Sequence, residues 1–218
     1  MVHDEIRRPK KVRGLAAFDL DGTLLRGPTV CEILAKPFGR LAEMQRFESQ
    51  PAHADFTSAR EEMARWYSGV SVDELVCHLR TAQWAPGAHE SVRLLQREGI
   101  EVALVSVTWS FAVAWFAKQV NISYYLGTGL SPSGEIAHVW GPDKASFIRT
   151  LSAKLQVPRD RVAAIGDSCG DFEMLKEADL RIFVGKTAPT DITSLTHLPD
   201  ADLRTVADHL LHEWIDRS

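Results

Sequence analysis

The sequence predicts an α/β protein: a doubly wound parallel sheet with a small helical domain inserted after the first strand. Short apolar runs of strand length alternate with stretches of helical periodicity along most of the chain. Residues 26–85 show helical periodicity alone. Polar side chains directly follow several of the apolar runs, as expected where ligands bind outside the carboxyl ends of parallel strands.

The first predicted strand, residues 15–18, runs into two carboxylates, Asp19 and Asp21. Period-two alternation places both on the same side of the strand. Gly22 then permits a sharp turn, and Thr23 offers a hydroxyl. Two carboxylates at the end of a buried strand are costly to hold together without a cation. The alternative is a strand that runs into an ordinary Asp-Gly turn.

Residues 26–85 form the predicted inserted domain, which we call the cap. Its apolar residues recur every three or four positions, as in Val30, Ile33, Leu34, Phe38 and Leu41. Gly69 ends one helix, and Ser71 to Glu74 begins the next with a capping-box pattern. We expect residues 1–25 and 86–218 to form the sheet-containing core domain.

The core elements follow in alternating order. Pro86 is expected as the first residue of a helix that runs to Glu98, with Gly99 as its stop. The later helices are predicted at 109–120, 142–155, 171–178 and 202–215. The strands are predicted at 100–105, 122–126, 161–165 and 180–184, with a hairpin turn at 132–135. Right-handed crossovers between these strands give a parallel sheet.

Composition narrows the class of protein. The 218 residues are 45% hydrophobic and 25% charged, which is typical of a globular protein. A net charge of −4 provides no overall positive field that would attract nucleic acid. We expect the basic run at 7–13 to be a solvated segment that leads into the first strand. No apolar run approaches the roughly 20 residues that span a membrane. Three scattered cysteines predict neither a disulfide framework nor a zinc cluster, so we expect a reducing, cytoplasmic location.

The polar residues at the predicted strand ends suggest phosphoryl transfer. The acidic set suits Mg²⁺, which prefers oxygen ligands; it consists of Asp19, Asp21, Asp167 and Asp171. Ser106 precedes a predicted helix, whose amide donors could help it hold an anion, and Lys144 adds a positive charge. Taken singly, Ser106 reads as a helix N-cap, Lys144 as a surface residue and Asp171 as a helix cap.

With these motifs the sequence resembles the phosphatase branch of the haloacid dehalogenase superfamily. Residues 18–24 are similar to its first motif and Val105-Ser106 to its second. Lys144 stands where the lysine of the third motif is expected, and residues 166–171 are similar to the fourth. The resemblance implies a Rossmann-like core and a C1-type helical cap, closest to the phosphoserine phosphatase-like subgroup, with Mg²⁺ as cofactor and a small phosphate ester as substrate.

The resemblance also implies roles. Asp19 would take the phosphoryl group as an aspartyl-phosphate, its pKa lowered by the cation and the lysine. Asp21 would protonate the leaving oxygen and then activate water. The metal would be held by Asp19, the backbone carbonyl of Asp21, and Asp167, with Asp171 as a ligand or a support of the ligands. The phosphate would be held by Ser106, Val107, Lys144 and Thr23.

The cap departs from the phosphoserine phosphatase pattern. Where that subgroup carries a glutamate for the substrate amine, this chain has Pro28, and Glu32 comes one helical turn later. Where the subgroup carries an arginine for the substrate carboxylate, ungapped alignment places Met63, with Arg60 and Arg65 close by.

The second motif also departs, since Ser106 is followed by Val107 and Thr108 instead of two glycines. We therefore expect a different small organic phosphate: a sugar or polyol phosphate, an amino-alcohol phosphate or a metabolite of a specialised pathway. Trp66 and Tyr67 are candidates for leaving-group contacts or for the cap core. The alternatives are phosphoserine phosphatase activity, a phosphotransferase on the same fold, and a binding protein without turnover, which the intact acidic set disfavours.

Overall fold

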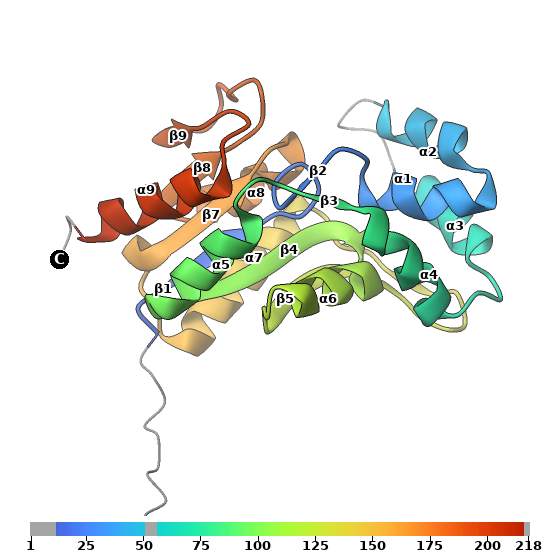
Figure 1. Ribbon diagram of the computed structural model, residues 1–218, viewed down its shortest axis with the longest axis horizontal. Helices are drawn as coiled ribbons and strands as arrows, with labels where there is room; N and C mark the ends of the chain where they lie inside the picture. The colour runs from blue at the N-terminus through green and yellow to red at the C-terminus, as the bar shows by residue number, and fades with distance from the viewer. Residues whose placement is uncertain (1–11, 51–55, 216–218) are drawn as a thin grey trace, which may run out of the picture.

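The computed structural model describes residues 12–50 and 56–215 (Figure 1). Most of the basic run at 7–13, and the first eleven residues of the expected core domain, lie outside these ranges. Within them, no helix is both long enough and apolar enough to cross a membrane.

The core is a 7-stranded sheet in the order β6-β5-β4-β1-β7-β8-β9. Its central strand β1 (Gly14–Phe18) pairs in parallel with β4 (Ile100–Trp109) and β7 (Val162–Gly166). Outside these lie β5 (Tyr124–Leu130), β8 (Leu180–Phe183) and β9 (Leu195–His197), also parallel. At the edge of this sheet β6 (Ile136–Ala137) pairs antiparallel with β5, in the expected hairpin. The predicted fold class is confirmed.

Helices cover both faces of the sheet, which explains why its central strands are apolar throughout. Ala16 and Phe18 point toward the face packed by α5 (Ala88–Arg97), α6 (Ser110–Gln119) and α9 (Leu203–Ile215). Leu15 and Ala17 point toward the face packed by α7 (Gly141–Leu155) and α8 (Phe172–Glu177). This alternation buries every side chain of β1.

The helices of the cap lie at one end of the molecule (Figure 1). They are α1 (Val30–Ala35), α2 (Leu41–Glu48), α3 (Thr57–Trp66) and α4 (Val72–His78). Ser71 caps α4 in a capping box with Glu74, as predicted. A two-stranded ribbon joins these helices to the core, with β2 (Leu25–Arg26) antiparallel to β3 (Gln83–Trp84).

Several elements differ from the predictions, among them the short strands β2 and β3, which were not predicted. Strand β4 continues past Ser106 to Trp109, with a register shift against β5 between Val105 and Trp109. Helix α5 begins at Ala88, because Gly87 precedes it in the left-handed conformation (φ 74°), so Pro86 is not a helical residue. Strand β9 was not predicted, since its three partly buried residues lack a hydrophobic pattern.

Gly185 brings the end of β8 against the loop after β7. A Cβ at this position would lie 2.1 Å from the backbone oxygen of Asp167 and 2.7 Å from the Phe183 ring. We expect Gly185→Ala to lower the free energy of unfolding by about 1–3 kcal/mol, because backbone must shift to admit the methyl group. Urea denaturation would measure this difference.

Gly141→Ala is the matched control, since its Cβ would meet the Gly170 carbonyl oxygen at an ordinary 3.4 Å. This change should leave the unfolding free energy nearly unaltered. Equal values for the two variants would contradict the packing argument.

Candidate active site

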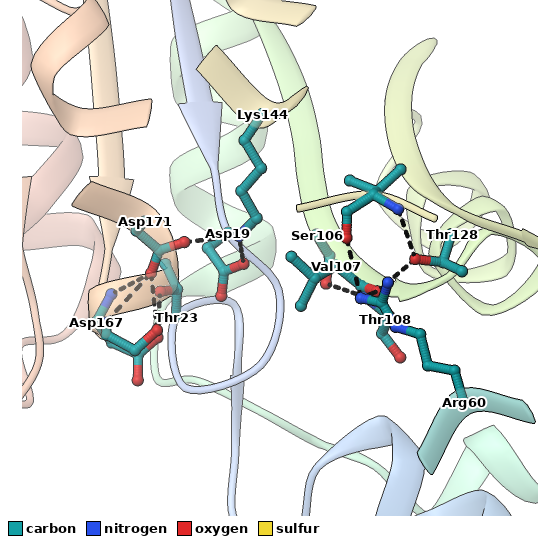
Figure 2. A network of polar contacts seen from close by, with 12 residues as sticks. Asp19, Thr23, Arg60, Ser106, Val107, Thr108, Thr128, Lys144, Asp167 and Asp171 are labelled. Carbon is teal, nitrogen blue, oxygen red and sulfur yellow. Dashed lines mark hydrogen bonds and ion pairs between the residues drawn. The ribbon is translucent and has the colours of Figure 1, made fainter. Parts of the chain in front are cut away.

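Lys144 lies buried between two carboxylates at the carboxyl edge of the sheet (Figure 2). Its Nζ is 2.6 Å from Asp19 Oδ1 and 2.6 Å from Asp171 Oδ1. Asp19 directly follows β1, Lys144 lies in the first turn of α7, and Asp171 precedes α8. All three are buried, with exposed fractions of 5%, 1% and 0%. Lys144 is therefore an internal cation and not the surface residue it would be in isolation.

The pKa values in this cluster reflect burial and mutual charge. Burial, followed by the Asp171 charge, raises the pKa of Asp19, while Lys144 acts to lower it. Burial alone would lower the pKa of Lys144, but the Asp171 and Asp19 carboxylates outweigh it and raise that pKa. Lys144 therefore stays protonated at neutral pH. The protein's own groups thus raise the pKa of Asp19, and the lowered pKa that we expect depends on a bound cation.

Asp171 also organises the loop that carries Asp167. Its Oδ2 accepts hydrogen bonds from the backbone N–H of Asp167 at 3.0 Å and of Ser168 at 3.2 Å. It makes no side-chain capping bond to α8, so the helix-cap interpretation is wrong. On the other side of the loop, Thr23 Oγ1 donates to Asp167 Oδ1 at 3.4 Å. A Cβ on Gly22 (φ 81°) would lie 2.1 Å from Asp167 Oδ2.

These carboxylates fit a divalent cation. Asp19, Asp167 and Asp171 each offer a carboxylate oxygen, and these oxygens lie within 4.8 Å of one another. Burial and the Asp171 charge raise the pKa of Asp167 to about 6, which shows the cost of crowding these negative charges. Lys144 offsets only part of that charge. An all-oxygen donor set with surplus negative charge suits Mg²⁺.

Asp21 faces the cap. Its Oδ1 accepts a hydrogen bond of 2.8 Å from the backbone N–H of Val30, the first residue of α1. Strand β1 ends at Phe18, so the alternation that predicted paired carboxylates does not extend to Asp21. Burial raises the pKa of Asp21 to about 7, although the Val30 bond opposes the shift. A carboxyl group in this environment can carry a proton near neutral pH.

Ser106 and Val107 lie on β4, the neighbour of β1 in the sheet (Figure 2). Ser106 is buried, and its Oγ accepts a hydrogen bond of 3.2 Å from the Thr108 backbone N–H. Helix α6 begins only at Ser110, so the expected amide donors of a helix N-terminus are not adjacent to Ser106, nor is Ser106 a helix cap. Thr108 Oγ1 also lies 3.4 Å from Cys31 Sγ in cap helix α1.

The cap candidates for substrate recognition bind other protein groups. Glu32 accepts from the Thr29 backbone N–H in a capping box and from Gln45. Met63 is buried in the hydrophobic core, and exposed Arg65 pairs with Glu62. Arg60 donates to core carbonyl groups and stacks on a core tryptophan, as described below.

The aromatic candidates of the cap are packing residues. Tyr67 is buried edge-on against Trp109, and Trp66 stacks on Phe47. The cap-core alternative is therefore the one that the geometry supports.

Glu48, at the end of α2, was not singled out from the sequence. It accepts a hydrogen bond of 2.5 Å from Thr29 Oγ1, and its charge contributes to the raised pKa of Asp21. No sequence signal identifies it, because a glutamate on a polar helix face looks like any solvated residue.

Comparisons with known proteins agree with this geometry. The sequence pattern of the haloacid dehalogenase-like hydrolases matches residues 16–176. The phosphoserine phosphatase of Archaeoglobus fulgidus is 27% identical over 77% of this chain, which spans 51% of that relative's length. The phosphoserine phosphatase of Idiomarina loihiensis is 27% identical over 79% of this chain and 82% of its own length.

Solved structures share the fold. A substrate-bound phosphoserine phosphatase complex superposes with a TM-score of 0.78 at 18% identity, covering 90% of this chain and 98% of that one. A phospho-aspartyl intermediate analogue of phosphoserine phosphatase superposes with a TM-score of 0.77 at 20% identity. This superposition covers 91% of this chain and 99% of that one. The match to the family pattern confirms the expectation that the chain is a hydrolase of this superfamily. The chain belongs to the haloacid dehalogenase-like hydrolase family.

Proposed function

We propose that this phosphatase is an Mg²⁺-dependent phosphomonoesterase that hydrolyses a small organic phosphate through an aspartyl-phosphate on Asp19. The observation that carries the proposal is the buried contact of Lys144 with Asp19 and Asp171, beside the third carboxylate of Asp167. We also propose a reducing, cytoplasmic location, because the three cysteines are odd in number and widely scattered along the sequence.

In the first half-reaction, an Asp19 carboxylate oxygen attacks phosphorus while the bond from phosphorus to the leaving oxygen breaks. Asp21 donates its proton to that oxygen, which leaves as an alcohol. In the second half-reaction, Asp21 takes a proton from a water molecule as that water attacks the phosphorus, which frees Asp19 and releases inorganic phosphate. The cap lies over Asp21, consistent with restricted access of water.

We assign binding of the phosphoryl oxygens to four residues: Lys144, Ser106, Val107 and Thr23. Lys144 supplies fixed positive charge, and Ser106 supplies a hydroxyl proton. An ion held by Asp19, Asp167, Asp171 and the Asp21 backbone carbonyl would supply charge neutralisation for the phosphoryl group and for Asp19.

The geometry of the cap supports a substrate other than phosphoserine, such as a polyol, sugar or amino-alcohol phosphate. The terminal nitrogens of Arg60 and the carboxylate of Glu32 contact protein groups, which disfavours their use to bind the charged groups of an amino acid. Phosphoserine itself is the second candidate, because the relatives and the solved structures described above are named phosphoserine phosphatases.

Asp19→Asn should abolish phosphate release, with a loss of at least about 10³-fold, because an amide cannot act as the nucleophile. Release of phosphate from p-nitrophenyl phosphate with Mg²⁺ would measure the loss. Asp160→Asn, at an exposed position before the opposite end of β7, is the charge-matched control and should retain activity. Substantial turnover by Asp19→Asn would contradict the proposed nucleophile.

Asp21→Asn should slow both formation and breakdown of the phosphoenzyme by about 10²–10⁴-fold, since both steps lose their proton carrier. Mg²⁺ affinity should stay close to wild type, because an asparagine keeps the backbone carbonyl. In the wild type, phosphoenzyme formation should fall as pH rises through about 7, where Asp21 loses its proton, and the variant should lack this dependence. Rapid-quench kinetics and calorimetry would measure these effects. Loss of Mg²⁺ binding in the variant would show that the assigned roles are wrong.

A panel of phosphomonoesters should give the highest kcat/KM for an ester without the amino acid zwitterion, because Glu32 and Arg60 contact other protein groups. The panel should include phosphoserine, polyol, sugar and amino-alcohol phosphates. By far the highest kcat/KM for phosphoserine would establish the second candidate instead. Added alcohols test the phosphotransferase alternative, since transfer to them in preference to water would favour it.

A further inference from the structure

Arg60 is a buried cation of the cap whose partners belong to the core. Only 6% of the residue is exposed. Its Nη2 donates to the backbone oxygens of Val107 at 3.0 Å and of Val139 at 2.9 Å. Its Nη1 lies 3.1 Å from His138 Nδ1, and the guanidinium stacks 3.8 Å from the centre of the Trp140 ring. A guanidinium is buried at this depth only where such acceptors compensate for lost water.

The contacts of Arg60 close into a ring with Thr128 (Figure 2). The Val107 carbonyl accepts a second hydrogen bond, of 2.8 Å, from Thr128 Oγ1. Thr128 Oγ1 in turn accepts from the Val139 N–H at 3.2 Å, and the Val139 carbonyl returns to Arg60. Two donors on one carbonyl oxygen hold the peptide plane between Val107 and Thr108 in a fixed orientation.

That peptide plane leads directly to Ser106. In a trans peptide the N–H points away from the C=O, so the Thr108 N–H is directed away from Arg60. It donates to Ser106 Oγ at 3.2 Å. A hydroxyl oxygen that accepts this bond keeps its own proton for another acceptor. The orientation of the Ser106 hydroxyl thus depends on a carbonyl that the cap holds.

The second arm of the ring leads toward Lys144. Val139 and Trp140 immediately precede α7, whose first turn carries Lys144. Arg60 therefore holds the backbone directly after Ser106 and the backbone that leads into the helix of Lys144.

We propose that Arg60 is a positioning residue, which couples docking of the cap to the phosphate-binding arrangement of Ser106 through the Val107 carbonyl. The inference rests on the proposed function, because it takes Ser106 as a phosphate-binding group. In this role Arg60 touches no substrate. It differs from an arginine that reads a substrate carboxylate, because its effect is the same for esters that have no carboxylate.

Arg60→Ala tests the coupling in the Mg²⁺-loaded enzyme, with p-nitrophenyl phosphate as substrate and inorganic phosphate as inhibitor. We expect kcat/KM to fall roughly tenfold or more, since small misplacements of binding groups have effects of this size. The inhibition constant for inorganic phosphate should rise by a similar factor. Arg65→Ala, on the same helix, is the matched control, because it removes the same charge from an exposed side chain and should change neither value.

Thr128→Val provides an independent variant, since it removes the other donor to the Val107 carbonyl from a core strand that does not belong to the cap. It should raise the inhibition constant for inorganic phosphate by a similar factor. In the double variant, the rise should be smaller than the product of the two single-variant factors. Circular dichroism would establish that each variant is folded. If Arg60→Ala does not fold, the inhibition constant of Thr128→Val would test the proposal.

The proposal is overturned if Arg60→Ala leaves both values for the carboxylate-free ligands unchanged and raises KM only for carboxylate-bearing esters. Fully multiplicative effects in the double variant would also overturn it. If the wild type hydrolyses no phosphomonoester, the proposed function fails. Calorimetric binding of inorganic phosphate to the wild type and to these variants would still decide the role of Arg60.

Discussion

The structure depends on one buried contact, that of the Lys144 ammonium with the carboxylates of Asp19 and Asp171. These groups come from α7, from the end of β1 and from the turn after β7, so the contact joins one helix to two neighbouring strands. Leaving any of these charges without its partner would cost about 3–5 kcal/mol, which makes the arrangement close to all-or-none. The sheet order matters for the chemistry because it places β1 beside β7 and so brings these side chains to one point.

The two carboxylates after β1 serve different neighbours. Asp19 faces the lysine and the other acids of the core, whereas Asp21 faces the N-terminus of cap helix α1. The cap therefore contacts the site at separate places: Asp21 through Val30, and the backbone beside Ser106 through Arg60. The cap thus contacts both the carboxyl group of Asp21 and the strand that carries Ser106.

Much of this arrangement could be predicted from the sequence, because its signals are local. The site residues follow apolar runs or lie at the starts of helices, at positions that the strand order brings together. They are Asp19, Lys144, Asp167 and Asp171. Strand β9 and the extension of β4 through Ser106 could not be predicted, because their polar residues look like loop. The contacts of Arg60 could not be predicted either, since its partners include backbone carbonyl groups, which every residue has and no pattern distinguishes.

The ribbon of β2 and β3 has a consequence for how such proteins diversify. Leu25 pairs with Trp84, so the chain leaves the core and returns to it at adjacent points. The distance between these points is set by the ribbon and does not depend on what lies between them. An insertion of another length or architecture can therefore be grafted there without moving Asp19. The sheet therefore fixes the position of Asp19, whereas the contacts at Asp21 and beside Ser106 come from the inserted cap and would change with it.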